Sequence, residues 1–139
     1  MNQSCNLLNK IYHNAKTGAE TINVLLLKMR SEDFKILLLA QKEKYLKIAN
    51  EAAELLAGYR TLPTDVGFAA KIGLWTAMEM NTSGRADRAA ETIIDACTSG
   101  IIEIAKLLNS GNFDAKTKDL AERLVDTEQK SMYFAQSFL

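Results

Sequence analysis

The sequence of 139 residues contains only one proline, Pro63, and only one histidine, His13. Because proline interrupts helices, its scarcity leaves room for long, continuous helices. Histidine supplies many of the general bases and nitrogen ligands of helical enzymes, so a chain with a single histidine has few ways to be one. The two scarcities together favour a helical protein that binds or assembles over one that catalyses.

The chain also lacks an excess of charge of either sign and a long apolar run. Its 17 basic and 17 acidic residues give a formal net charge of zero, which disfavours nucleic acid as a partner. No apolar run approaches the roughly 18 residues of a membrane span, and the first residues do not follow the pattern of a secretion signal. We therefore expect a cytoplasmic protein without a membrane span.

Cysteine is scarce as well, with Cys5 and Cys97 alone. A helical domain of this size gains little from one disulfide, so we expect two reduced thiols packed among other side chains. The spacing of Cys97 from the small residues Ala96 and Gly100 favours a role in close helix packing. His13 falls on the outward face of its helix and is expected at the surface.

Apolar residues recur with helical period in four long segments, which predicts an all-α fold. Ser31 and Asp114 precede two of these segments and are expected to cap them, because their side-chain oxygens can accept hydrogen bonds from the first helical amides. The four helices are expected over about residues 6–30, 32–59, 85–109 and 115–137.

A fifth, shorter helix is predicted over about residues 65–80, after the break at Pro63. The four long helices are each about 36 to 42 Å long, whereas this one spans about 24 Å. It therefore fits best as the crossover between the second and third bundle helices, which would then run parallel. We expect a single domain over residues 1–139.

The matched helix lengths, the long crossover, and the small-residue segment 86–100 followed by the apolar segment 101–108 resemble the ferritin-like superfamily. Among its members, the chain is similar to small uncharacterised bacterial proteins of the spore-coat-associated type. The resemblance implies a ferritin-like four-helix bundle. It also implies a bacterial setting, cytoplasmic or spore-associated. Members with two metals use a glutamate from each of two helices and a Glu-x-x-His pair from each of the other two.

The sequence departs from that ligand pattern. The inward positions three residues apart read Gln41 and Lys44 on the second helix and Glu128 and Ser131 on the fourth, and neither helix has its histidine. Lysine is a protonated donor that opposes a cation. We therefore interpret these four positions as a degenerate metal site and expect no cofactor.

Glu128 needs a partner if it lies inside the bundle, because a buried, unpaired carboxylate is costly. One hypothesis is a polar cluster in which Lys44 pairs with Glu128, alongside Gln41, Tyr45 and Ser131. The alternative is that Lys44 extends to solvent and Glu128 lies at a wet edge of the apolar stripe.

The predicted crossover helix is apolar almost all round. Phe68, Ile72 and Trp75 lie on the face opposite the one that can cover the bundle. A second copy of the chain could bury them, which predicts a homo-oligomer interface. Burial by the chain's own termini, or by the loop around Tyr59, is the alternative.

Two classes of function remain, and a third is remote. The first is a non-catalytic bundle that acts by self-association or by binding a protein partner, such as a structural component of a bacterial assembly. The second is a ferritin-like metal or redox protein that uses carboxylate ligands only, from Glu103, Glu128 and Glu51. The third is a bundle that binds a ligand, which requires an interior cavity.

Overall fold

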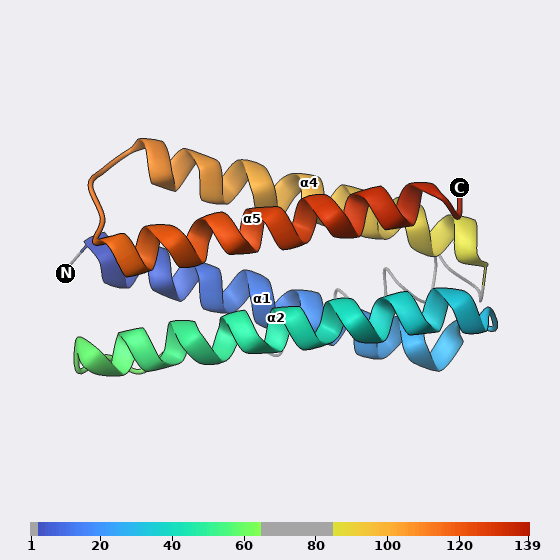
Figure 1. Ribbon diagram of the computed structural model, residues 1–139, viewed down its shortest axis with the longest axis horizontal. Coiled ribbons are helices and arrows are strands. Elements are labelled where there is room, and N and C mark those ends of the chain that lie inside the picture. The colour runs from blue at the N-terminus through green and yellow to red at the C-terminus, as the bar shows by residue number, and fades with distance from the viewer. Residues whose placement is uncertain (1–2, 65–84) are drawn as a thin grey trace.

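The computed structural model describes residues 3–64 and 85–139, and this part of the chain is all-helical (Figure 1). The prediction of an all-α fold with four long helices is confirmed for the described residues. The helices are α1 (Gln3–Lys28), α2 (Glu32–Gly58), α4 (Ala86–Asn109) and α5 (Ala115–Gln136).

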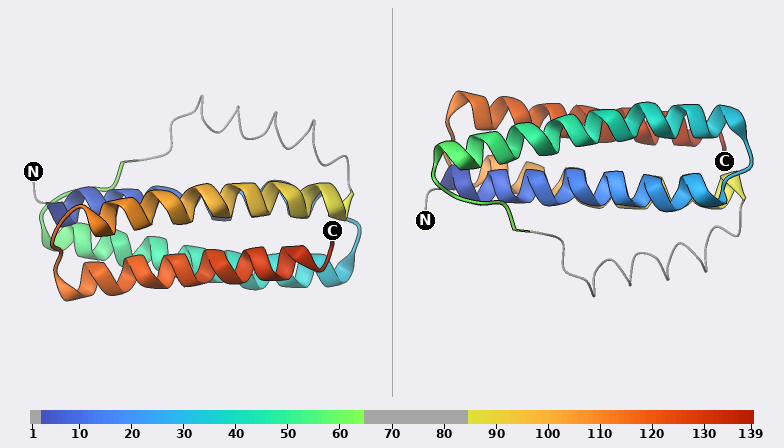
Figure 2. Two further views of the ribbon diagram at one scale, coloured as in Figure 1. Left: turned by 90° about the horizontal axis from the view of Figure 1, so that it is seen from above. Right: turned by 90° about the horizontal axis from the view of Figure 1, so that it is seen from below.

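The four helices lie along one long axis and form a bundle (Figures 1 and 2). Helices α1 and α2 form one antiparallel hairpin and α4 and α5 form another, while contacts of α2 with α5 and of α1 with α4 join the two hairpins. Figure 1 shows α2 and α4 running in the same direction, as the sequence predicts. The predicted crossover helix, with Phe68, Ile72 and Trp75, lies outside the described residues.

Side-chain caps set the beginnings of α2 and α5, and both predicted caps are confirmed. The Phe34 amide donates to Ser31 Oγ over 3.2 Å, and the Thr117 amide donates to Asp114 Oδ1 over 2.8 Å. Each bond satisfies an amide that has no partner within its own helix. Asp114 also accepts a hydrogen bond from the Tyr59 hydroxyl, which joins the end of the first hairpin to the start of α5.

The core follows the predicted apolar stripes. On α1, for example, the side chains one and two turns apart at Leu8, Ile11 and Ala15 are all fully buried. None of the helices in the described part of the chain is long and apolar enough to cross a membrane.

The buried face of α4 differs from the others because it consists mainly of small residues. Its buried residues are Ala89, Ala90, Cys97, Gly100 and Ile104. Four of these five side chains fill little volume, so α4 leaves space between itself and the bulkier faces of the other helices. This space is the cavity described next.

Candidate functional site

A cavity of about 190 Å³ lies between the four helices. Each helix contributes to its wall: Thr17 and Gly18 from α1, Gln41 and Tyr45 from α2, Cys97 and Gly100 from α4, Glu128 and Ser131 from α5. Apolar side chains complete the wall, among them Ile22, Phe34, Leu38, Ile93, Phe134 and Phe138. Ala96 and Ser99 also line it and are exposed, so the cavity reaches the surface beside α4.

A small set of buried polar side chains gathers at the cavity from three helices. Ser131 Oγ lies 3.0 Å from Gln41 Oε1 and 3.0 Å from the Thr127 carbonyl oxygen, and its hydroxyl can donate to either. The Tyr45 hydroxyl lies 3.7 Å from Cys97 Sγ. Gln41, Glu128 and Ser131, which the sequence predicts to share the bundle interior, therefore line one cavity.

Glu128 is the most unusual of these residues. Only 5% of its surface is exposed, and its Oε2 atom has no hydrogen-bond partner among the residues that the structure describes. Burial raises the pKa of Glu128 to about 8, and the negative charge of Glu103 adds to the increase. At neutral pH the side chain is therefore mainly a neutral carboxylic acid.

Two glycines make room for the titratable side chains of the cavity. A Cβ atom at Gly100 would come within 2.7 Å of both carboxyl oxygens of Glu128, and one at Gly18 would come within 3.0 Å of the Tyr45 ring. Glycine inside a helix costs about 1 kcal/mol relative to alanine. The close approach of Glu128 and Tyr45 to the neighbouring backbones explains why glycine stands at both positions despite this cost.

The prediction that Lys44 faces the interior is wrong. Lys44 is exposed, and no ion pair joins it to Glu128 in the described part of the chain. The buried stripe of α2 passes from Gln41 to Tyr45, four residues on, so the position three residues after Gln41 falls beside the stripe. Glu128 is not at a wet edge either, because it is almost fully buried.

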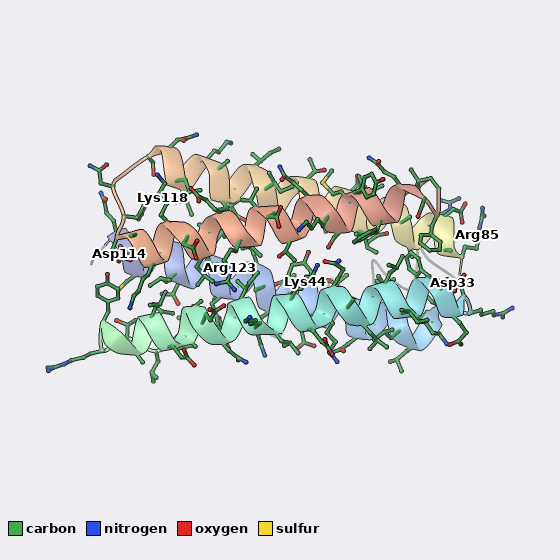
Figure 3. The ribbon with its side chains drawn as sticks, viewed as in Figure 1. Asp33, Lys44, Arg85, Asp114, Lys118 and Arg123 are labelled. Atoms are coloured by element: carbon green, nitrogen blue, oxygen red, sulfur yellow. The ribbon has the colours of Figure 1, made fainter. Side chains whose placement is uncertain are left out.

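The carboxylates proposed for the metal-binding alternative do not meet. Glu51 is bound by Arg123, whose Nη1 and Nη2 lie 3.1 and 2.6 Å from its two oxygens, and Figure 3 shows Arg123 extending between α5 and α2. Glu103 lines the cavity but pairs with Lys10. Within residues 3–64 and 85–139, no three His, Cys, Asp or Glu side chains gather in a way that could hold a metal ion.

The cavity does not fit the metal centre that the resemblance implies. Gln41, Glu128 and Ser131 supply only one carboxyl group, together with an amide and a hydroxyl. A two-metal centre of the implied kind uses four glutamates and two histidines, and these three positions provide only one of those groups. The donor set is therefore better suited to hydrogen bonding than to coordination.

The one histidine and the two cysteines lie as the sequence predicts, the histidine near the surface and the cysteines packed inside. His13 is partly exposed, and its Nε2 lies 2.6 Å from Thr64 Oγ1. Cys5 and Cys97 are both buried free thiols. Burial raises the pKa of Cys97 to about 12, so this thiol remains protonated and unreactive at neutral pH.

Sequence reasoning missed three contributions to the cavity. Cys97 is read as a packing residue but contacts Tyr45, and Asn14 lines the cavity with a buried Nδ2 atom that has no partner in the described ranges. The third contribution is that of the glycines. Gly18 could have been recognised from the sequence, because an isolated glycine inside a helical pattern usually has a packing reason, whereas Gly100 lies among other small residues.

Comparison with known proteins found no family model, no curated protein and no solved structure that matches the chain significantly.

Proposed function

We propose that this protein is a helical bundle that binds a small, largely apolar molecule in its interior cavity. The observation that carries the proposal is the cavity itself, lined by apolar side chains and a few buried polar ones from all four helices. Binding sites for small molecules have this composition, and helical bundles place them between facing helices. The third class of function considered from the sequence is thus the best supported.

The titratable groups of the cavity favour binding over catalysis. Burial raises the pKa values of Tyr45, Cys97 and Glu128, so that all three side chains are mainly protonated at neutral pH. The fourth group, Glu103, is held by Lys10. Among the described lining residues none is then poised as a general base or an anionic nucleophile.

The size of the cavity sets the size of the ligand. An engineered protein cavity of about 150 Å³ accommodates benzene. A cavity of about 190 Å³ therefore has room for a ring with a short substituent. Benzyl alcohol is a suitable neutral probe, because its ring matches the apolar wall and its hydroxyl can bond to Gln41 or Ser131.

Filling the cavity tests the proposal. Ala135 is buried and lines the cavity, so Ala135→Leu should occupy part of the space without straining the core. We expect benzyl alcohol to bind the native protein in calorimetric titration and its affinity to fall at least tenfold in this variant. Ala40→Leu, at an exposed position of α2, is the matched control and should leave the affinity unchanged. Failure of the native protein to bind benzyl alcohol or any charged probe of the same shape would refute the proposal.

We also propose that the bundle is ferritin-like in descent and that its metal site has degenerated. The parallel direction of α2 and α4 supports this, as does the position of Gln41, Glu128 and Ser131 around one interior cavity. Restoring ligands by Gln41→Glu together with Ser131→His should produce measurable binding of zinc or iron. No gain in metal affinity in a folded double variant would count against the descent.

Self-association is a second candidate function, and exposed apolar side chains on α2 favour it. Ile36 and Leu39 lie one turn apart and are 62% and 49% exposed. We propose that this face contacts a second copy of the chain, in addition to the interface that the sequence predicts for Phe68, Ile72 and Trp75. The solution mass should exceed that of one chain, and Ile36→Lys with Leu39→Lys should lower it. A monomeric native protein would exclude this function.

A further inference from the structure

The cavity contains a buried acid that nothing in the described chain satisfies. Glu128 is 5% exposed and lines the cavity, and its Oε2 atom has no hydrogen-bond partner within the described residues. A buried polar atom without a partner costs about 1 to 3 kcal/mol. A ligand that supplies the missing partner would recover this free energy, so Glu128 marks the polar end of the site.

The charge of the cavity wall indicates the sign of the ligand. Two acidic residues, Glu103 and Glu128, belong to the wall, and the described lining residues include no lysine, arginine or histidine. An anionic ligand would therefore meet two acids and no counter-ion. A cationic ligand would meet Glu128, and the half-exposed Glu103 would add to the negative potential.

Aromatic rings provide a second attraction for a cation. Tyr45, Phe34, Phe134 and Phe138 all line the cavity, and the rings of Phe34 and Phe138 pack edge to face with their centres 4.4 Å apart. The faces of such rings attract ammonium groups, and they also cover the apolar body of a ligand.

Neutral hydrogen-bonding groups complete the polar end. Gln41 and Ser131 lie on the same cavity and bond to each other over 3.0 Å. Burying two charges costs several kcal/mol unless the pair gains further hydrogen bonds. The Gln41 carbonyl oxygen and the Ser131 hydroxyl line the same cavity as Glu128, and both are able to accept hydrogen bonds from the N–H groups of an ammonium ion.

We infer that the ligand is a small primary amine with an apolar body, bound as an ammonium ion against the Glu128 carboxylate. On binding, the ammonium group keeps its proton and the carboxylic acid of Glu128 releases its own to solvent, so that an ion pair replaces an unpartnered acid. The inference rests on the proposed function, because it names the ligand class of the same cavity.

The test compares three probes of nearly equal shape on the native protein: benzylamine, benzyl alcohol and benzoate. We expect benzylamine to bind about tenfold more tightly than benzyl alcohol, as suits a charge-assisted hydrogen bond, and benzoate not to bind. If benzyl alcohol binds as tightly as benzylamine, the amine inference is overturned and the cavity proposal stands. If none of the three binds, both fail.

The variant Glu128→Gln then tests whether Glu128 causes the preference for benzylamine over benzyl alcohol. The substitution preserves shape and removes the negative charge, so the affinity ratio of benzylamine to benzyl alcohol should fall to about one or below, while benzyl alcohol still binds. Glu122→Gln, at an exposed position of the same helix, should retain the native ratio. A preference that persists in Glu128→Gln would overturn the inference, and the three-probe comparison decides the matter if this variant does not fold.

Discussion

Glu128 is the residue on which the chemistry of the cavity depends. It is buried against the α4 backbone at Gly100, and its pKa is raised to about 8 from an ordinary value of 4.5, first by burial and then by the charge of Glu103. Tyr45 and Cys97, which line the cavity from α2 and α4, ordinarily have pKa values above neutrality, and burial raises these values further, so both are neutral at pH 7. The other acidic residue of the described wall, Glu103, is half-exposed and pairs with a lysine of α1.

This raised pKa predicts how stability depends on pH. Between about pH 4.5 and pH 8 the folded protein holds a proton on Glu128 that the unfolded chain has released, so the free energy of unfolding should fall as pH rises. The slope from this group is at most about 1.4 kcal/mol per pH unit. Urea unfolding at pH 5, 6, 7 and 8 measures it.

The variant Glu128→Gln should remove that slope and be more stable than the native protein at pH 8. The glutamine amide stays neutral at every pH, whereas the buried glutamate is partly ionised at pH 8. Glu122→Gln should retain the native slope, since Glu122 is exposed. Equal slopes for the native protein and Glu128→Gln between pH 5 and pH 8 would show that Glu128 is charged in the folded state.

Gly100 keeps the carboxyl group of Glu128 in its place. In Gly100→Ala the new Cβ atom would approach both oxygens to 2.7 Å, so the end of the Glu128 side chain, which lines the cavity, would have to shift. We expect the affinity for benzyl alcohol to fall, while the better helix propensity of alanine, about 1 kcal/mol, offsets the cost of the displacement in stability.

Gly58→Ala provides the comparison for this variant, because a Cβ atom there meets nothing within 4 Å. It should be neutral or stabilising by up to about 1 kcal/mol and should bind the probe as the native protein does. Equal binding by the two alanine variants would mean that Gly100 does not shape the cavity.

At the scale of helices, we expect the clearest effect on stability from removing the Asp114 cap of α5. Burial raises the pKa of Asp114, but hydrogen bonds from the Tyr59 hydroxyl and the Thr117 amide outweigh it and lower the pKa to about 2. Asp114→Ala removes both bonds and should destabilise the protein by about 1 kcal/mol in chemical denaturation.

Asp114→Asn should recover most of that loss, because asparagine caps helices about as well as aspartate. If both variants lose the same stability, the charge of Asp114 matters and the cap does not. If neither variant loses any, the bond to Thr117 contributes nothing.

The helices themselves could be predicted from the sequence, because their signals are local. The caps at Ser31 and Asp114 and the stripe of Leu8, Ile11 and Ala15 depend only on residues a few positions apart. The inward position of Glu128 and Ser131 followed from the same periodicity. The orientation of Lys44 did not, because the stripe drifts by part of a residue per turn and an edge position can fall on either side.

At the scale of the whole molecule, the cavity could not be predicted, since it depends on how far apart four helices settle. The small residues of α4 were visible in the sequence, but small residues permit either close packing or empty space. Whether the helices pack closely or leave a cavity depends on the side chains that face these small residues from the other helices. Here Tyr45 and Glu128 reach the backbones at Gly18 and Gly100. The space beside them remains open.

The most direct test of the central claim is to locate a bound probe by methyl NMR in solution. Benzyl alcohol should shift the methyl signals of Ile22, Leu38 and Ile93, which line the cavity. It should leave those of Leu7, Leu56 and Leu124 unchanged, since these leucines are fully buried but are not part of its wall. Equal shifts in both groups, or shifts confined to exposed methyl groups such as those of Ile36, would contradict a binding site inside the bundle.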